Sequence, residues 1–117
     1  MKYREIAFVG YPVTDMARAR TFYEDVLGLS EVKEFSPEWV EYAVGTGTLA
    51  LARMDEWKPS NDGPSAGLEA EDFEAVVAAL RSANAAFVVE PMDTSVCRMC
   101  VVRDPDGNQV TIHRRKE

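Results

Sequence analysis

Two stretches of this chain carry the same spacing of apolar residues, and they lie about half a chain length apart. The chain has 117 residues, and the matched positions are separated by 57 residues. The matched pairs are Asp15 and Asp72, Met16 and Phe73, Ala19 and Val76, and Tyr23 and Leu80. Self-similarity at a fixed distance indicates a duplicated structural unit. The chain is therefore expected to fold as two related halves.

Both matched stretches are predicted to be helices with marked ends. In residues 13–29, Thr14 or Asp15 can accept a hydrogen bond from a free N–H of the first turn. Gly28 can adopt the left-handed conformation that ends a helix. The apolar residues fall on one stripe, so this helix should pack by one face. The second helix is expected from Asp72, with Asn84 at the position where it stops.

Alternation of apolar and polar residues predicts four strands in each half. The expected strands are residues 5–13, 29–35, 39–44 and 48–54, then 65–70, 86–90, 95–103 and 109–114. We therefore expect an α+β fold in a single domain, residues 1–117, made of two βαβββ modules. Their expected bounds are residues 1–55 and 65–117, joined by a linker rich in turn residues at 56–64. The modules are expected to form a curved mixed sheet around a central trough.

Composition excludes several classes of partner. The net charge is −7, with 20 acidic and 13 basic residues, which argues against nucleic acid because a phosphate backbone requires a basic face. No apolar run approaches the roughly 20 residues of a membrane-spanning helix, so no membrane partner is expected. Two cysteines are too few for a disulfide framework. Together with the lack of a signal peptide pattern, they favour a reducing, cytoplasmic location.

The helix-free faces of the two modules are expected to line the trough, which is the natural ligand site. Alternation assigns the following residues to this lining: Phe8, Gly10, Trp39, Glu41, Ser65, Gly67, Glu69, Arg98, Cys100, Thr111 and His113. An aromatic ligand surface, or alternatively part of the core, is expected from four rings, those of Phe8, Trp39, Trp57 and Phe35. The candidate ligand-binding residues are Phe8, Trp39, Glu69, Arg98, Cys100 and Thr111.

Three stretches resemble the vicinal oxygen chelate superfamily, which groups glyoxalase I, extradiol dioxygenases and bleomycin- or fosfomycin-resistance proteins. They are residues 13–29, the repeat at 71–80, and the turn Arg103-Asp-Pro-Asp-Gly-Asn108. The resemblance covers nearly the whole chain. It implies paired βαβββ modules, a cavity in each module pair and a homodimer.

The resemblance also implies where a divalent metal would be held. By motif position, the usual ligands of the superfamily fall on Phe8, Ser65 and Thr111, and a fourth position falls among residues 49–51. Phenylalanine cannot coordinate a metal, and neutral hydroxyls are poor ligands for zinc, nickel or iron(II). Metal-dependent glyoxalase or dioxygenase chemistry is therefore not expected at this place, and no cofactor is predicted.

Glu41 and His113 are the candidate catalytic residues. His113 is the only histidine, and it is either a general base or a partly solvated residue near the C-terminus. Glu41 and Arg98 occupy matched positions, so they either hold a polar ligand group together or neutralise each other. Cys100 is either a reactive thiol or a small buried apolar residue.

Three functions remain open from the sequence. The first is a metal-free protein of the bleomycin-resistance type that binds a small aromatic or amphipathic molecule in a trough of a homodimer. The second is a lyase or isomerase that uses Glu41 and His113, with or without a metal at another position. The third is a partner domain without a small ligand.

Overall fold

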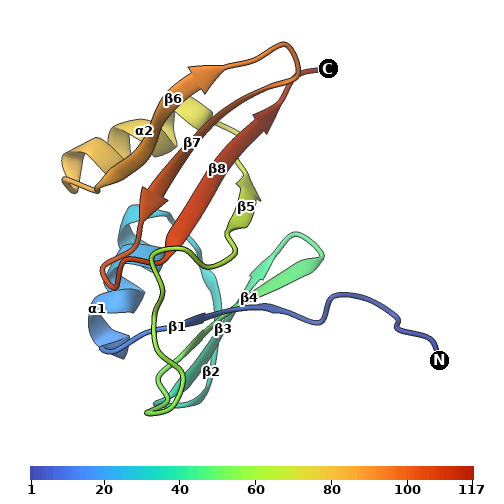
Figure 1. The fold of residues 1–117 in the computed structure, drawn as a ribbon, viewed down its shortest axis with the longest axis vertical. Helices are drawn as coiled ribbons and strands as arrows, with labels where there is room; N and C mark the ends of the chain where they lie inside the picture. Colours follow the sequence, from blue (N-terminus) through green and yellow to red (C-terminus); the bar gives the residue numbers. More distant parts are fainter.

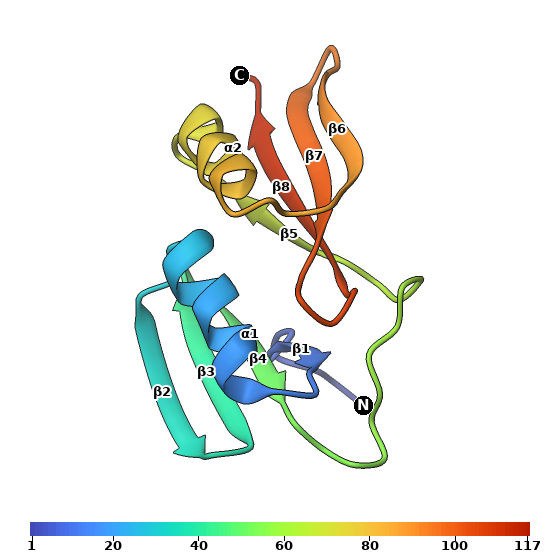
Figure 2. The same cartoon turned by 90° about the vertical axis from the view of Figure 1, so that its left-hand side faces the viewer.

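The computed structural model describes all 117 residues and contains two mixed four-stranded sheets, each accompanied by a helical segment. Module 1 contains β1 (Val9–Pro12), α1 (Met16–Arg20), the π-helix η1 (Thr21–Val26), β2 (Glu31–Ser36), β3 (Trp39–Val44) and β4 (Gly47–Ala52). Module 2 contains β5 (Ala66–Glu69), α2 (Phe73–Ser82), β6 (Phe87–Asp93), β7 (Cys97–Arg103) and β8 (Gln109–Arg115). Figures 1 and 2 show the two modules stacked along the long axis. The predicted α+β fold of two βαβββ modules is confirmed.

Strand order is the same in the two sheets, as expected for a duplicated unit. The orders are β1-β4-β3-β2 and β5-β8-β7-β6. The first strand of each module pairs in parallel with the last, and all other pairs are antiparallel. The eight strands form two separate sheets within one chain. In each sheet the first strand lies at an edge and has one unpaired side.

The helices begin and end at the residues that their sequence marks. The side chains of Asp15 and Asp72 accept the backbone N–H of the residue three positions on, at 3.1 and 3.0 Å. Gly28 and Asn84 both have positive φ, 80° and 56°, where the helical segments end. The first helix differs from expectation in one respect, because its second half has π-helical hydrogen bonds such as Leu27 N–H to Phe22 O.

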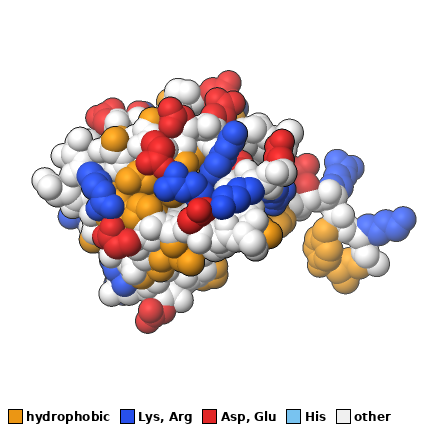
Figure 3. Space-filling model, turned by 90° about the horizontal axis from the view of Figure 1, so that it is seen from above, with side chains coloured by type: hydrophobic (Ala, Val, Ile, Leu, Met, Phe, Trp, Pro, Cys, Tyr) orange, Lys and Arg blue, Asp and Glu red, His pale blue; other side chains and the backbone are white.

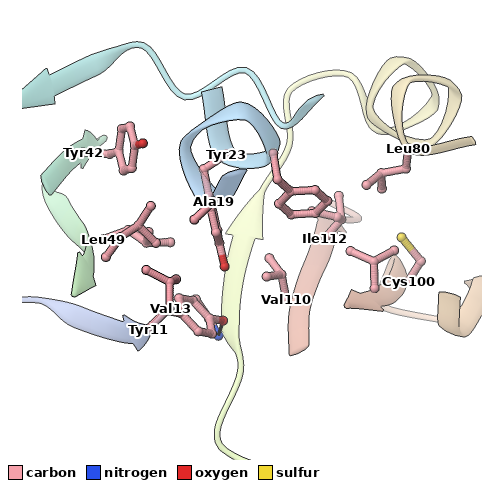
Figure 4. Close-up of a cluster of buried hydrophobic side chains, with 14 of the residues drawn as sticks. Tyr11, Val13, Ala19, Tyr23, Tyr42, Leu49, Leu80, Cys100, Val110 and Ile112 are labelled. Carbon is pink, nitrogen blue, oxygen red and sulfur yellow. Dashed lines mark hydrogen bonds between the residues drawn. The ribbon is translucent and has the colours of Figure 1, made fainter. Parts of the chain in front are cut away.

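One hydrophobic core is shared by both modules. Seventeen buried residues from both sheets and both helical segments form a single cluster. Figure 4 shows Tyr42 and Leu49 of module 1 on one side of Tyr23, and Ile112 and Cys100 of module 2 on the other. The helix-covered faces of the two sheets therefore turn toward each other. Their helix-free faces lie on the outside of this shared core.

The turn between β7 and β8 fastens module 2 to module 1. The Asn108 side-chain amide donates to the backbone oxygen of Pro12 at 2.8 Å, and the Tyr23 hydroxyl donates to Asp104 Oδ2 at 2.8 Å. The Tyr11 hydroxyl donates to the backbone oxygen of Gln109 and accepts the N–H of Ala66, both at 2.7 Å. Burial raises the pKa of Asp104 above its usual range, although the hydrogen bonds that its carboxylate accepts from Asn108 and Tyr23 oppose the shift.

The N-terminal segment departs from its predicted structure. A strand was expected over residues 5–13, but β1 begins only at Val9 and ends at Pro12. Residues 1–8, which we call the N-terminal arm, are all exposed and extend away from the two sheets (Figures 1 and 3). No strand of the same chain lies beside the arm, so its backbone has no partner for a ladder. No helix in the molecule is long and apolar enough to cross a lipid bilayer.

Candidate functional site

The predicted trough residues are divided between two separate faces. An open pocket on the helix-free face of module 2 has a volume of about 600 Å³ and is lined by Gly67, Glu69, Thr111 and His113, among others. Glu41 lines a different pocket, which is formed entirely by module 1. A single chain therefore does not bring Glu41 and His113 together. The predicted couple between these two residues does not form within one copy.

Three aromatic side chains come together on the helix-free face of module 1. We call Phe8, Trp39 and Trp57 the aromatic cluster. The Phe8 and Trp39 rings meet edge to face, with centroids 5.3 Å apart. Trp57, which comes from the segment between the modules, lies against Gly10, where an added Cβ would be 2.8 Å from its Cη2 atom. The glycine is therefore required for this close approach.

Small residues form the floor beneath the aromatic cluster. Ala50 and Ala52 of β4 are fully buried, although they lie outside the main core. Their neighbours across the sheet are Gly10 on β1, and Glu41 and Trp39 on β3. Phe8 and Trp57 remain 41% and 37% exposed, so the rings cover the floor but also present apolar surface to solvent. The rings are thus walls of a surface site rather than members of the main core.

Glu41 is held beside the aromatic cluster by a tryptophan. The indole Nε1–H of Trp39 donates to Glu41 Oε2 at 2.7 Å. Lys33 lies directly across the strand pair from Glu41, and its Nζ is 4.7 Å from the centre of the Phe35 ring. Phe35 is exposed and contributes a further aromatic surface on β2. The arrangement offers aromatic faces together with one oriented carboxylate.

The module 2 face carries polar groups instead. His113 Nδ1 and Glu69 Oε1 lie 2.6 Å apart, and the backbone N–H of Arg115 donates to Glu69 Oε2 at 2.7 Å. The Arg115 N–H, followed by His113, lowers the pKa of Glu69 because each favours its charged form. Two residues before His113 on β8, the Thr111 hydroxyl shares a hydrogen bond of 2.8 Å with the hydroxyl of Ser65. This face can therefore donate and accept protons or hydrogen bonds.

The predicted placement of Arg98 and Cys100 on the trough face is wrong. The Cys100 side chain is fully buried in the core, and the Arg98 guanidinium lies 4.9 Å from the Phe73 ring of α2 and pairs with Glu74. Arg98 is thus paired with a helix residue, and the expected Glu41–Arg98 pair does not form.

The error has a simple geometric cause. The core residues Val40 and Tyr42 of β3 correspond to Cys100 and Val102 of β7, which are 60 residues further on rather than 57. Module 2 therefore has three more residues before this strand. Because successive side chains point to opposite faces, an odd shift reverses the assignment. Met99 and Val101 occupy the helix-free face instead, opposite His113 and Thr111. The hairpin between β6 and β7 is longer than its counterpart in module 1, because four residues separate the paired Asp93 and Arg98 whereas two separate Ser36 and Trp39, and sequence alone did not reveal this difference.

The positions implied for a metal by the superfamily do not fit one. Phe8 packs on Trp39, and the Ser65 and Thr111 hydroxyls are satisfied by each other. The fourth implied ligand position falls among residues 49–51, and all three of their side chains are apolar and buried. No group of three or more His, Cys, Asp or Glu residues is placed to hold a metal ion. This donor set lacks the imidazole, thiolate and carboxylate groups that transition metals require.

Comparisons with solved structures agree with this fold. TnmS3, described as an antibiotic binding protein from Streptomyces sp. CB03234, is 22% identical with a TM-score of 0.78, and the match covers 99% of each chain. A glyoxalase/dioxygenase from Nostoc punctiforme is 20% identical with a TM-score of 0.78, covering 97% of this chain and 92% of that one. A glyoxalase/bleomycin resistance protein from Streptomyces sp. CB03234 is 24% identical with a TM-score of 0.74, covering 94% and 100%.

Sequence comparison identifies the family directly. No curated protein sequence matches the chain significantly. The family model described as the Glyoxalase/Bleomycin resistance protein/Dioxygenase superfamily matches residues 5–112, which include both modules. The chain belongs to the glyoxalase/bleomycin resistance protein/dioxygenase superfamily.

Proposed function

We propose that this protein binds a small aromatic or amphipathic molecule without a metal, in a site formed by two copies of the chain. The aromatic cluster of Phe8, Trp39 and Trp57 is the observation that carries the proposal. Aromatic faces with a few placed polar groups are typical of small-molecule sites. Glu41, fixed by the Trp39 indole, would orient a donor group of the ligand. The likeness to an antibiotic binding protein supports the same class of ligand.

The need for a second copy follows from the direction of the two faces. The pocket beside Glu41 and the pocket beside His113 are each lined by a single module. Both faces lie outside the shared core, so each is open on one side. A ligand pocket normally buries most of its ligand. A homodimer that sets the module 1 face of one copy against the module 2 face of the other would enclose a ligand between aromatic and polar walls.

Tryptophan fluorescence tests the binding proposal directly. The chain has two tryptophans, and both belong to the aromatic cluster. We expect saturable quenching by bleomycin or anthraquinone-2-sulfonate, together with a higher melting temperature, because a ligand that binds the native state stabilises it. Trp57→Ala should weaken binding, whereas Val96→Ala, which trims an exposed apolar residue elsewhere, should not. If no planar aromatic probe changes either signal, the proposal fails.

A second candidate function is a metal-free lyase or isomerase. The contact between His113 and Glu69 supports it, because a carboxylate on Nδ1 can orient an imidazole for proton transfer at Nε2. Glu41 of a second copy would then be the other acid–base group. The test is deuterium incorporation from heavy water into the hemithioacetal of methylglyoxal and glutathione. Loss of exchange in His113→Ala would favour catalysis, and no exchange in the unaltered protein would exclude it for this substrate.

A further inference from the structure

Two methionines and the only histidine lie side by side on the helix-free face of module 2. Met92 on β6 is the register partner of Met99 on β7, and Met99 is the register partner of His113 on β8, so the three residues cross neighbouring strands (Figure 1). Direct partners in a sheet point to the same face, with Cβ atoms about 4.5–5.5 Å apart. Met99 and His113 are half-buried, and Met92 is 43% exposed. We call these three residues the sulfur–imidazole row.

A β-bulge turns Met92 onto this face. Between Val89 and Met92, β6 advances three residues while its partner β7 advances two, from Val101 to Met99. Pro91 lies within this irregular step, as is common at bulges. Because successive side chains alternate, a regular strand would have placed Met92 on the helix side. Bulges often re-aim a side chain next to a functional site, and this one gives the row its third member.

Packing does not explain the two methionines. Methionine often fills irregular gaps in a core, because its side chain is flexible. Neither Met92 nor Met99 belongs to the hydrophobic core or to the residues packed against it. Cys100 and Val102 supply the core side of β7 instead. The two thioether sulfurs therefore have no role in the core.

Glu69 orients the His113 ring toward the methionines. His113 Nδ1 lies 2.6 Å from Glu69 Oε1, and Glu69 is on β5, on the opposite side of β8 from β7. The two ring nitrogens point in nearly opposite directions, so Nε2 faces the side on which Met99 lies. The only hydrogen bond of the ring is the one at Nδ1. A carboxylate on one ring nitrogen that leaves the other free is the usual support of a metal-binding histidine.

This set of donors selects a soft metal ion. Thioether sulfur is a ligand for Cu(I), whereas Mg²⁺, Ca²⁺ and Mn²⁺ prefer oxygen. Imidazole also suits copper. Structural and catalytic zinc sites use thiolate, imidazole and carboxylate ligands rather than thioethers. Two thioethers beside one imidazole therefore favour Cu(I) over these divalent ions.

We infer that Met92, Met99 and His113 form a Cu(I) site on the helix-free face of module 2, with Glu69 positioning the imidazole. The two thioether sulfurs and His113 Nε2 are the ligands. None of the positions that the superfamily implies for a metal belongs to this row. The site lies within one module of one copy, so it needs neither the aromatic cluster nor a second copy. It goes beyond the proposed function, and each of the two can fail without the other.

Competition for Cu(I) tests whether the row holds the ion. Bathocuproine disulfonate is the coloured competitor, used near neutral pH and without oxygen so that the copper stays Cu(I). Met92→Leu, Met99→Leu and His113→Ala should each weaken Cu(I) binding at least about tenfold, since even outer-shell partners of a metal site contribute about 10- to 100-fold. Met54→Leu is the matched control, because Met54 is 49% exposed and lies outside the row, and its affinity should not change. Unchanged affinity in the chain with both Met92→Leu and Met99→Leu overturns the inference.

The thiol beside the row needs a separate comparison, because thiolates also bind Cu(I). Cys97 comes two residues before Met99 on β7, so it points to the same face. We expect folded Cys97→Ala to hold Cu(I) with unchanged affinity. Loss of binding in this variant would assign the ion to the thiol and overturn the inference.

Methyl spectra of the unaltered chain identify the ligands directly. Ag(I) is the probe, because it binds the same soft donors as Cu(I) and is stable in air. We expect an equimolar amount to shift the ε-methyl signals of Met92 and Met99 and the ¹⁵N signal of His113 Nε2, and to leave Met54 unchanged. Zn²⁺ should leave all the methionine methyl signals unchanged. Equal shifts at all the methionines would mean adventitious binding and would overturn the inference.

The positioning role of Glu69 has its own spectroscopic signature. Glu69→Gln removes the carboxylate that holds His113 Nδ1, so we expect about tenfold weaker Cu(I) binding. The ¹⁵N signals of this variant should show Ag(I) on both ring nitrogens, whereas the unaltered chain should bind it through Nε2 alone. Ligation that stays confined to Nε2 in Glu69→Gln would overturn the positioning role.

Discussion

Tyr23 of η1 and Asp104 of the β7–β8 turn form a buried hydrogen bond between the two modules. The hydroxyl donates to Asp104 Oδ2 at 2.8 Å, and the exposed fractions of the two residues are 0% and 5%. Asp104 also accepts the backbone N–H of Asp106 and both the backbone and side-chain N–H of Asn108. The carboxylate thus orders its own turn and holds that turn against module 1.

Removing this hydroxyl should weaken the junction. Tyr23→Phe leaves a buried carboxylate oxygen with one donor fewer, so we expect the free energy of unfolding to fall by about 1–3 kcal/mol. Tyr42→Phe is a matched control, because its ring is equally buried but its hydroxyl donates to Glu24, which is partly exposed and also paired with Arg20. Urea denaturation should show a larger loss for Tyr23→Phe. Equal losses would mean that the Tyr23–Asp104 hydrogen bond stabilises the fold no more than the Tyr42–Glu24 hydrogen bond does.

Stability should also depend on pH through Asp104. Burial raises its folded-state pKa, so the folded chain holds this proton more tightly than the unfolded chain does. Its contribution to the free energy of unfolding must then fall as pH rises from the unfolded-state pKa through the raised folded-state pKa. Asp104→Asn lacks this titration. We expect the difference in stability, unaltered protein minus variant, to decrease with pH over this interval and then to level off.

Urea titrations from about pH 3 to pH 7 would measure that difference. Using a difference removes the contributions of other groups, such as Glu24 and Glu69, whose lowered pKa values act in the opposite direction. A difference that increases with pH would show that the hydrogen bonds from Tyr23 and Asn108 outweigh burial. The folded-state pKa would then be lowered rather than raised.

Local sequence signals predicted most of the fold because each has a direct physical cause. Trp39–Val44 alternates because one face of β3 packs on the core, and the strand forms with those bounds. Asp15 and Asn84 mark helix ends through hydrogen bonding and a left-handed backbone conformation. The π-helical turn in η1 was not predicted, because its residues also suit an ordinary helix.

The site was harder to predict because it depends on how elements are placed in space. Alternation placed Glu41 and His113 on helix-free faces, and the structure agrees. Alternation could not show that these two residues line separate pockets within one chain. It assigned Cys100 to the wrong face because three additional residues precede β7. The separation of Glu41 from His113 and the burial of Cys100 both depend on contacts between segments that are distant in the sequence.

The two cysteines should be unreactive in the folded protein. Cys100 is fully buried and Cys97 is 6% exposed, and burial raises the pKa of the Cys100 thiol, which lowers its thiolate fraction. A coloured thiol reagent at neutral pH should modify neither cysteine in the native state and both in urea. Val96→Cys, at a neighbouring position that is 66% exposed, should react at once and serves as the positive control. Rapid modification of one native cysteine would restore the reactive-thiol hypothesis for this strand.

Replacing Gly10 should separate the aromatic cluster from the stability of the fold. In Gly10→Ala the new methyl group would lie 2.8 Å from Trp57 Cη2, so the indole must move away from the floor. Trp57 sits on an exposed segment, and alanine is compatible with a strand, so the free energy of unfolding should change by less than about 1 kcal/mol.

The same variant should bind anthraquinone-2-sulfonate about tenfold more weakly and shift the tryptophan emission. Gly47→Ala is the matched control, since its nearest contact is a backbone oxygen at 3.4 Å and no ring lies beside it. If Gly10→Ala moves the indole, as its emission would report, but leaves the affinity unchanged, then Trp57 only covers Ala50 and Ala52 and the ligand must bind elsewhere. If affinity and emission change together while stability holds, the ring is positioned for the ligand rather than for the fold.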